Sequence, residues 1–143
     1  MKILLIAAAL AAAPAGPAVA PDFFCDDVRA LAAGAEEADP FRSLRDRNFR
    51  PRLLGGCFFN SAGGYTCGKN LAQRGETRGA FADLIHACLP GSTRSSRRES
   101  FSRQEVVRLG RFEAQVSEHG LDRGHVGRTI NIYVASLPPE RPR

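Results

Sequence analysis

The sequence predicts an α+β protein in which two helices pack on a small antiparallel sheet held by two disulfides. Apolar residues recur at helical spacing in two segments, and apolar and polar residues alternate in others. The four cysteines form an even set, as in exported proteins with disulfides. The expected order is helix, two or three strands, helix, two strands.

The first twenty residues have the features of a secretory signal peptide. Met1 and Lys2 form a short positive start, residues 3–13 are apolar, and Ala18-Val19-Ala20 is typical of a cleavage site. Cleavage after Ala20 leaves proline as the new N-terminus, so cleavage after Ala18 is the alternative. The apolar run is shorter than the ~20 residues of a membrane-spanning helix. We therefore expect a periplasmic or secreted protein with no transmembrane segment.

The rest of the chain is predicted to form a single α+β domain over residues 21–137, followed by a disordered tail at 138–143. The tail contains three prolines and two arginines in its six residues and cannot continue a helix or strand. The full chain has a formal net charge of +5, and its only lysines are Lys2 and Lys69. This charge favours anionic partners without implying nucleic acid.

The first helix is expected from Asp22, as its N-cap, to near Asp39-Pro40. Its apolar positions recur at helical spacing: Phe24, Val28, Leu31 and Ala35. The adjacent carboxylates Asp26 and Asp27 are expected to face solvent near the positive end of the helix dipole. The basic segment 41–52 has only Phe41, Leu44 and Phe49 as apolar anchors, and a short first strand, the optional one, would begin over 52–54.

The stretch Gly63–Asn70 reads G-G-Y-T-C-G-K-N and has the glycines and lysine of a phosphate-binding loop. Such a loop needs Ser or Thr where this chain has Asn70, and it must open directly into a helix. The runs 57–60 and 65–67 instead favour a β-hairpin with its turn centred on Ala62, which places Cys57 opposite Cys67. We therefore expect no nucleotide binding.

The second helix is expected from about Thr77 to Leu89, ended by Pro90-Gly91. Cys88 lies on its apolar face, and Cys25 lies on or beside the apolar face of the first helix. A Cys25–Cys88 bond would join the two helices and accompany a Cys57–Cys67 bond in the hairpin. Spacing alone leaves the other pairings open.

The polar segment 91–103 reads G-S-T-R-S-S-R-R-E-S-F-S-R and is predicted to be an exposed, mobile loop. One interpretation is a solvated linker. The other is an anion-binding patch formed by Arg94, Arg97 and Arg98 with Phe101 as an apolar anchor, because the guanidinium fork binds carboxylates or phosphates bidentately.

Two half-buried strands are expected over 109–116 and 129–136. The predicted inward residues alternate along both strands: Phe112, Ala114, Val116, Ile130, Ile132 and Val134. The predicted outward residues include Glu113. The connecting segment 117–128 contains His119 and His125, which we interpret as exposed loop residues rather than metal ligands.

No catalytic constellation, metal site or cofactor motif is predicted. His86 lies two residues from Cys88, so the two side chains point to different faces of the helix. The leading hypothesis is a non-enzymatic exported binding protein, such as an envelope adaptor, an immunity protein or an inhibitor, with an acidic protein or anionic envelope polymer as partner. The alternatives are a small extracytoplasmic hydrolase or redox protein and a structural envelope component.

The order of predicted elements is similar to that of the secretion-chaperone-like α/β sandwich, in which a bent sheet carries helices on one side. This similarity implies a fold expectation alone, since fold does not determine function. The sequence does not indicate the oligomeric state.

Overall fold

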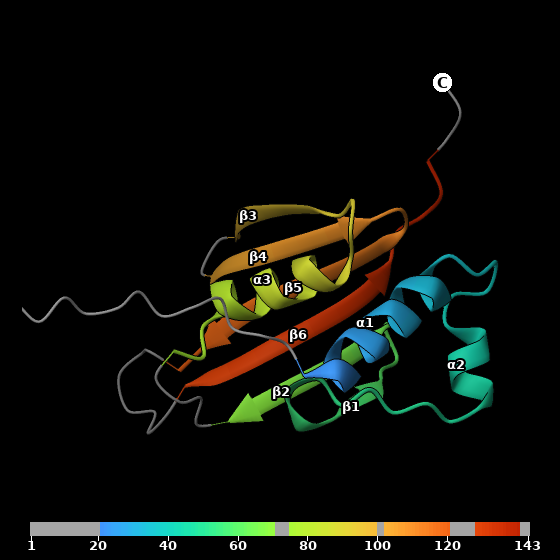
Figure 1. Ribbon diagram of the computed structural model, residues 1–143, viewed down its shortest axis with the longest axis horizontal. Helices are drawn as coiled ribbons and strands as arrows, with labels where there is room; N and C mark the ends of the chain where they lie inside the picture. The colour runs from blue at the N-terminus through green and yellow to red at the C-terminus, as the bar shows by residue number, and fades with distance from the viewer. Residues whose placement is uncertain (1–20, 71–74, 100–101, 121–127, 141–143) are drawn as a thin grey trace, which may run out of the picture.

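The computed structural model describes residues 21–70, 75–99, 102–120 and 128–140, which form a mixed helix and sheet structure (Figure 1). The predicted signal peptide, Phe101 and His125 lie outside these ranges. The helices and strands are, in chain order, α1 (Asp22–Ala35), α2 (Arg42–Asp46), the 3-10 helix η1 (Leu53–Gly55), β1 (Cys57–Phe59), β2 (Tyr65–Asn70), α3 (Arg78–Cys88), β3 (Thr93–Glu99), β4 (Ser102–Leu109), β5 (Phe112–His119) and β6 (Thr129–Ser136).

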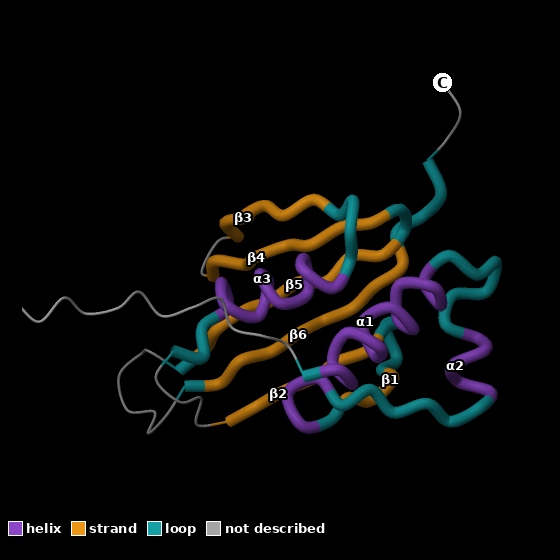
Figure 2. The backbone as a smooth tube through the Cα atoms, viewed as in Figure 1, coloured by secondary structure: helices purple, strands orange, loops and turns teal. Residues whose placement is uncertain are grey.

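The strands form one antiparallel six-stranded sheet in the order β1-β2-β6-β5-β4-β3 (Figure 2). Helices α1 and α3 cover one face of this sheet (Figure 1). Their apolar residues meet the alternating residues of the central strands, which are fully buried as predicted for Ile130, Ile132 and Val134. The two edges of the sheet are β1 and β3, on opposite sides of this core.

The predicted hairpin is confirmed. Strand β1 pairs with β2, Cys57 lies opposite Cys67, and the two cysteines are disulfide-bonded. The stretch that resembles a phosphate-binding loop is β-structure from Tyr65 to Asn70, and it pairs on its other side with β6. Its backbone N–H groups are therefore used in the hydrogen bonds of the sheet, as expected for a hairpin.

The second disulfide joins Cys25 on α1 to Cys88 at the end of α3. It ties together the two helices that cover the sheet, and all four cysteines are bonded. The pairing is the one that the predicted hairpin and helical faces favoured.

Helix α3 begins after Thr77, whose Oγ1 accepts a hydrogen bond from the Ala80 backbone N–H at 3.0 Å. Replacing an N-cap threonine removes a partner of an otherwise unsatisfied amide at the helix end. We expect Thr77→Ala to lower the free energy of unfolding by about 1 kcal/mol. Urea denaturation measures this, with Thr77→Ser as the control that keeps the acceptor; equal losses in both variants would contradict the capping role.

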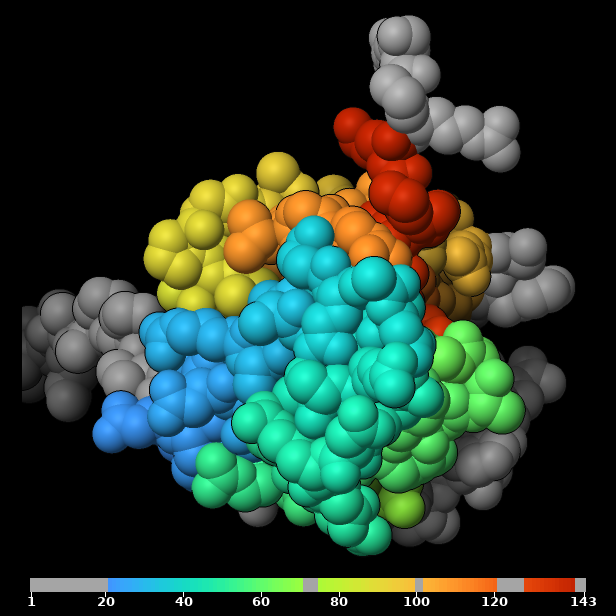
Figure 3. Space-filling model, turned by 90° about the vertical axis from the view of Figure 1, so that its right-hand side faces the viewer, coloured from blue at the N-terminus to red at the C-terminus, as the bar shows by residue number. Residues whose placement is uncertain are grey.

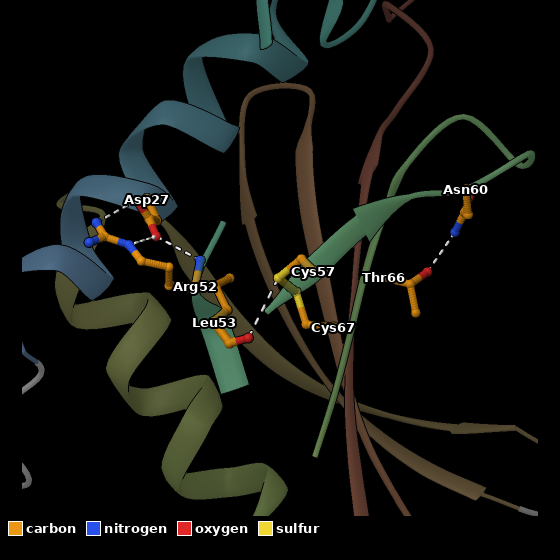
Figure 4. The surroundings of a disulfide bond; sticks show 7 residues. All are labelled: Asp27, Arg52, Leu53, Cys57, Asn60, Thr66 and Cys67. Carbon is orange, nitrogen blue, oxygen red and sulfur yellow. Dashed lines mark hydrogen bonds and ion pairs between the residues drawn. A yellow bond between two sulfur atoms is a disulfide. The ribbon is translucent and has the colours of Figure 1, made fainter. Parts of the chain in front are cut away.

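Three details of α1 differ from the prediction. The N-cap is Pro21 rather than Asp22, and the helix ends at Ala35 because Phe41, at φ 62°, turns the chain so that its N–H bonds the Gly34 carbonyl. Asp27 is buried rather than solvated. Its carboxylate accepts hydrogen bonds from the backbone and guanidinium of Arg52, which attaches α1 to the chain before β1 (Figure 4).

The basic segment after α1 is more ordered than its pattern suggested. Phe41 and Leu44 are buried as expected, and they bracket the start of the short helix α2. Glu37 accepts hydrogen bonds from the side chain and backbone N–H of Ser43, which lower the pKa of its carboxyl group. The optional strand over 52–54 is wrong: the chain forms η1 there, with Leu54 at φ 54°.

The prediction of a mobile loop over 91–103 is wrong, because residues 93–99 form strand β3. The strand has no large apolar residue and lies mostly exposed at the edge of the sheet. It forms because its backbone pairs with β4 over seven residue pairs, from Thr93↔Arg108 to Glu99↔Ser102. Polar side-chain contacts between the two strands also stabilise the pairing, for example the hydrogen bond that Ser96 Oγ donates to Glu105 at 2.7 Å.

The strand predicted over 109–116 is two strands. Leu109 ends β4 and Phe112 begins β5, with Gly110 at φ 55° in the two-residue turn, where a glycine avoids backbone strain. The inward set Phe112, Ala114 and Val116 is confirmed as buried. Glu113 points to the opposite face as predicted, but it is only 2% exposed and accepts hydrogen bonds from Arg108 and Gln115.

Candidate functional site

The predicted anion-binding arginines lie on the edge strand β3, and the alternation of the strand divides them. Arg94 and Arg98 share the face that α3 partly covers, together with Ser96. Arg97 points to the other face, where it donates to Gln104 at 3.0 Å and pairs with Glu99 at 3.3 Å. The three arginines therefore do not form one patch, and Phe101 lies outside the described residues.

Arg94 holds β3 to α3. Its guanidinium lies 2.8 Å from Asp83 and 3.6 Å from Glu105, and it donates to the Gly79 carbonyl at 3.3 Å. These three contacts use most of its donors. Arg94 is therefore a structural residue at this site rather than a free anion-binding group.

Two partly buried carboxylates, Glu105 on β4 and Glu118 on β5, lie beside β3. Arg78, in the first turn of α3, lies 3.5 Å from Glu105 and 3.1 Å from Glu118. Glu118 also pairs with Arg128, and Glu105 with Arg94. These arginines neutralise both carboxylates and leave no excess negative charge under the edge of the sheet.

Arg98 and Arg103 are the unusual pair. They lie directly opposite each other in the β3–β4 ladder, both exposed on the helix side. In the described part of the chain neither makes an ion pair or a side-chain hydrogen bond. Like charges directly opposite on neighbouring strands are destabilising. An anion between the two guanidinium groups would remove this repulsion.

A shallow hollow of about 250 Å³ opens at this pair, and we call it the arginine hollow. It is lined by Arg78, Ser96, Arg97, Arg98, Arg103 and Glu105. The buried Nε of Arg78 faces Glu105 at 3.5 Å, so the guanidinium groups without a partner within the described residues are those of Arg98 and Arg103. The hollow thus offers unused guanidinium donors in a planar fork, the chemistry that recognises a carboxylate or a phosphate.

Of the residues that line the hollow, the sequence prediction named Arg97 and Arg98 but not Arg78, Arg103 and Glu105. The sequence does contain a signal for Arg103, since antiparallel pairing of 93–99 with 102–109 places it across from Arg98. To use this signal, one has to predict a strand over residues 93–99, which include no large apolar residue. Arg78 could not be found in the same way, because its place depends on how α3 lies over the sheet.

The histidines and Cys88 do not form a catalytic arrangement in the described part of the chain. His86 Nδ1 lies 2.7 Å from Ser92 Oγ, and Cys88 is disulfide-bonded. His119 is exposed, 3.2 Å from Ser117 Oγ. Within the described ranges, no three His, Cys, Asp or Glu side chains are grouped so that they could hold a metal ion.

No described helix has the length and apolar character needed to cross a membrane. The two disulfides are compatible with an extracytoplasmic location. Comparison with known proteins gives no match: no family model, no curated protein and no solved structure matches the chain.

Proposed function

We propose that the protein is a non-enzymatic exported binding protein that holds an acidic partner protein at the arginine hollow. The observation that carries the proposal is the Arg98–Arg103 pair, two guanidinium groups placed directly opposite each other with no counter-ion within the described residues. The adjoining carboxylates are already neutralised by Arg78, Arg94 and Arg128, so an incoming carboxylate meets net positive charge.

The location on an edge strand supports a macromolecular partner. Strand β3 and the start of β4 are largely exposed, and the hollow is shallow, so that a side chain projecting from another protein can reach it. A bidentate arginine contact provides orientation as well as charge, which a featureless polyanion does not exploit. Adaptor, immunity and inhibitor proteins are the kinds of binding protein that this arrangement suits.

The test is affinity capture from an envelope fraction of the producing cells, comparing the wild type with Arg98→Gln/Arg103→Gln. Charge-assisted hydrogen bonds contribute about 1.5–3 kcal/mol each, so losing both arginines should weaken binding of the captured protein about 100-fold. The control is Arg29→Gln/Arg42→Gln, which removes the same charge from two exposed arginines in local ion pairs.

A single acidic protein retained by the wild type and the control, but lost by the Arg98/Arg103 variant, is the expected result. Equal weakening by both double variants, with retention falling steadily as salt rises, would instead indicate a structural component held by net charge alone. Full retention by the Arg98/Arg103 variant would contradict a role for the arginine hollow.

A further inference from the structure

The edge of the sheet opposite the arginine hollow, strand β1, has backbone groups available for another strand. Cys57 and Cys67 have a Cα–Cα distance of 4.2 Å, which is typical of a non-hydrogen-bonded pair in an antiparallel ladder. The next hydrogen-bonded positions agree, since the Asn60 N–H bonds the Gly64 carbonyl. The N–H and C=O groups of Cys57 and Phe59 therefore point away from β2, toward the open edge.

This edge faces a hollow of about 330 Å³, which we call the β1 hollow. Its lining combines β1 with the chain that follows α2: Arg45, Asn48, Phe49, Arg50, Cys57, Phe58, Phe59 and Tyr65. We call residues 42–50, helix α2 and the chain after it, the α2 segment. Figure 3 shows the side of the molecule where this segment, in cyan and teal, lies beside the green β1–β2 hairpin. The α2 segment thus forms the far wall of a space that begins at the unpaired edge.

The aromatic side chains of β1 point to both faces of the strand. Phe58 is 63% exposed, the most exposed large apolar side chain among the described residues. It lies on the helix-free face, whereas Phe59 lies on the helix side with its ring 5.3 Å from that of Tyr65. A strand added to β1 would contact Phe58 with one set of alternate side chains and the β1 hollow with the other.

The charged groups that line the β1 hollow are arginines, and no carboxylate lines it. Arg45 lies 5.2 Å from the centroid of the Phe59 ring, with Asp39 at 2.8 Å on its other side. Arg50 makes no ion pair within the described residues, and Arg47 lies over the ring of Phe49, which also lines the hollow. A strand entering this space would therefore gain from acidic side chains on its hollow-facing positions.

We propose that β1 binds an extended acidic segment of another protein, which adds to the sheet as a seventh strand. Main-chain hydrogen bonds to Cys57 and Phe59 would give affinity, and alternate side chains would give specificity. The preferred segment alternates acidic residues, facing Arg45 and Arg50, with apolar residues that contact Phe58. This site does not rest on the arginine hollow, which lies at the other edge of the sheet.

A second copy of the chain fits this edge less well. Two β1 strands paired about a twofold axis would bring Arg45, Arg47 and Arg50 of one copy toward the same arginines of the other. Like charges juxtaposed across an interface are unfavourable. The charge of the β1 hollow thus favours a different, acidic chain.

The test uses a synthetic peptide, acetyl-Glu-Val-Glu-Phe-Glu-Val-Glu-amide, titrated into the mature protein by calorimetry and by amide chemical-shift mapping. We expect saturable binding with the largest shifts at Cys57 and Phe59. N-methylation of the peptide amides that would face β1 should weaken binding at least about 10-fold, because it removes the main-chain donors. A peptide with lysine at each glutamate position should not bind.

The protein variants distinguish specific binding at β1 from nonspecific hydrophobic binding. Phe58→Ser should weaken binding about 10-fold without lowering the unfolding temperature, because this side chain is mostly exposed. The matched control is Phe23→Ser. Phe23 is another exposed phenylalanine, on α1, with Arg52 over its ring, and its substitution should leave binding unchanged. Arg45→Gln/Arg50→Gln should weaken binding of the glutamate peptide and reduce its salt dependence.

Three results would overturn the proposal. The first is no binding of the acidic peptide, or equal binding of its N-methylated form. The second is equal loss in Phe58→Ser and Phe23→Ser. The third is concentration-dependent self-association of the protein without peptide that Phe58→Ser abolishes, which would assign the edge to a second copy of the chain.

Discussion

Removing the disulfide between α1 and α3 with Cys25→Ala/Cys88→Ala is expected to lower the free energy of unfolding by about 4 kcal/mol. The bond closes a loop with a sequence separation of 63 residues, so the unfolded chain gains much conformational freedom without it. It also joins the two helices that cover the sheet, and Cys88 is fully buried. In thermal unfolding the midpoint should fall by roughly 15 °C for a domain of this size.

The hairpin disulfide provides the comparison. Cys57→Ala/Cys67→Ala opens a loop with a separation of only 10 residues, for which the same reasoning gives about 3 kcal/mol. Both variants retain one disulfide and contain no free thiol, so unfolding can be measured without thiol exchange. A larger loss for the hairpin variant would show that native-state contacts of β1, rather than chain entropy, determine the ranking.

Gly64→Ala is expected to destabilise the protein by about 3 kcal/mol, at the upper end of the range for inserting a group into a packed site. A Cβ at Gly64 would meet the backbone carbonyl oxygen of Val134 more closely than real Cβ contacts allow. It would also lie 3.0 Å from the ring of Tyr133. The tyrosine ring can move, but the carbonyl is fixed in β6, so β2 and β6 must separate.

The control for this prediction is Gly56→Ala, measured by the same urea denaturation. A Cβ at Gly56 meets nothing within 4 Å, and the residue has the extended φ of 162°. Its substitution should change the free energy of unfolding by less than about 0.5 kcal/mol. If the two variants unfold at the same urea concentration, close contact at Gly64 does not limit this part of the sheet.

The elements predicted correctly are those whose pattern is local. The 57–67 hairpin has β-forming runs on both sides of a glycine-containing turn, and residues 129–136 alternate without interruption. Strand β3 was missed because its order comes from pairing with β4, and polar residues contribute no alternation signal. Strand β4 was missed for a different reason: consecutive Val106 and Val107 are both buried, on opposite faces of the sheet.

The candidate sites show the same limit. The sequence indicated that the arginine-rich segment was distinctive, but only the β3–β4 register distinguishes Arg98, which faces Arg103, from Arg94, which is bound to Asp83 and Glu105. The β1 hollow could not be predicted at all. It depends on α2 and the chain after it, whose path is set by two non-glycine residues at positive φ, Phe41 and Asn48.

The two disulfides are nested, since the Cys57–Cys67 bond lies within the loop closed by Cys25–Cys88. A chain emerges N-terminus first from a ribosome or a translocation channel, so the first two thiols to meet an oxidant are Cys25 and Cys57, which are not partners. Oxidation in order of appearance would give Cys25–Cys57 and Cys67–Cys88. The native protein is reached only if Cys25 stays reduced until α3 has arrived, or if the early bond is exchanged by thiolate attack. Maturation of this small domain therefore requires disulfide isomerisation or delay, and an oxidant alone does not ensure the correct product.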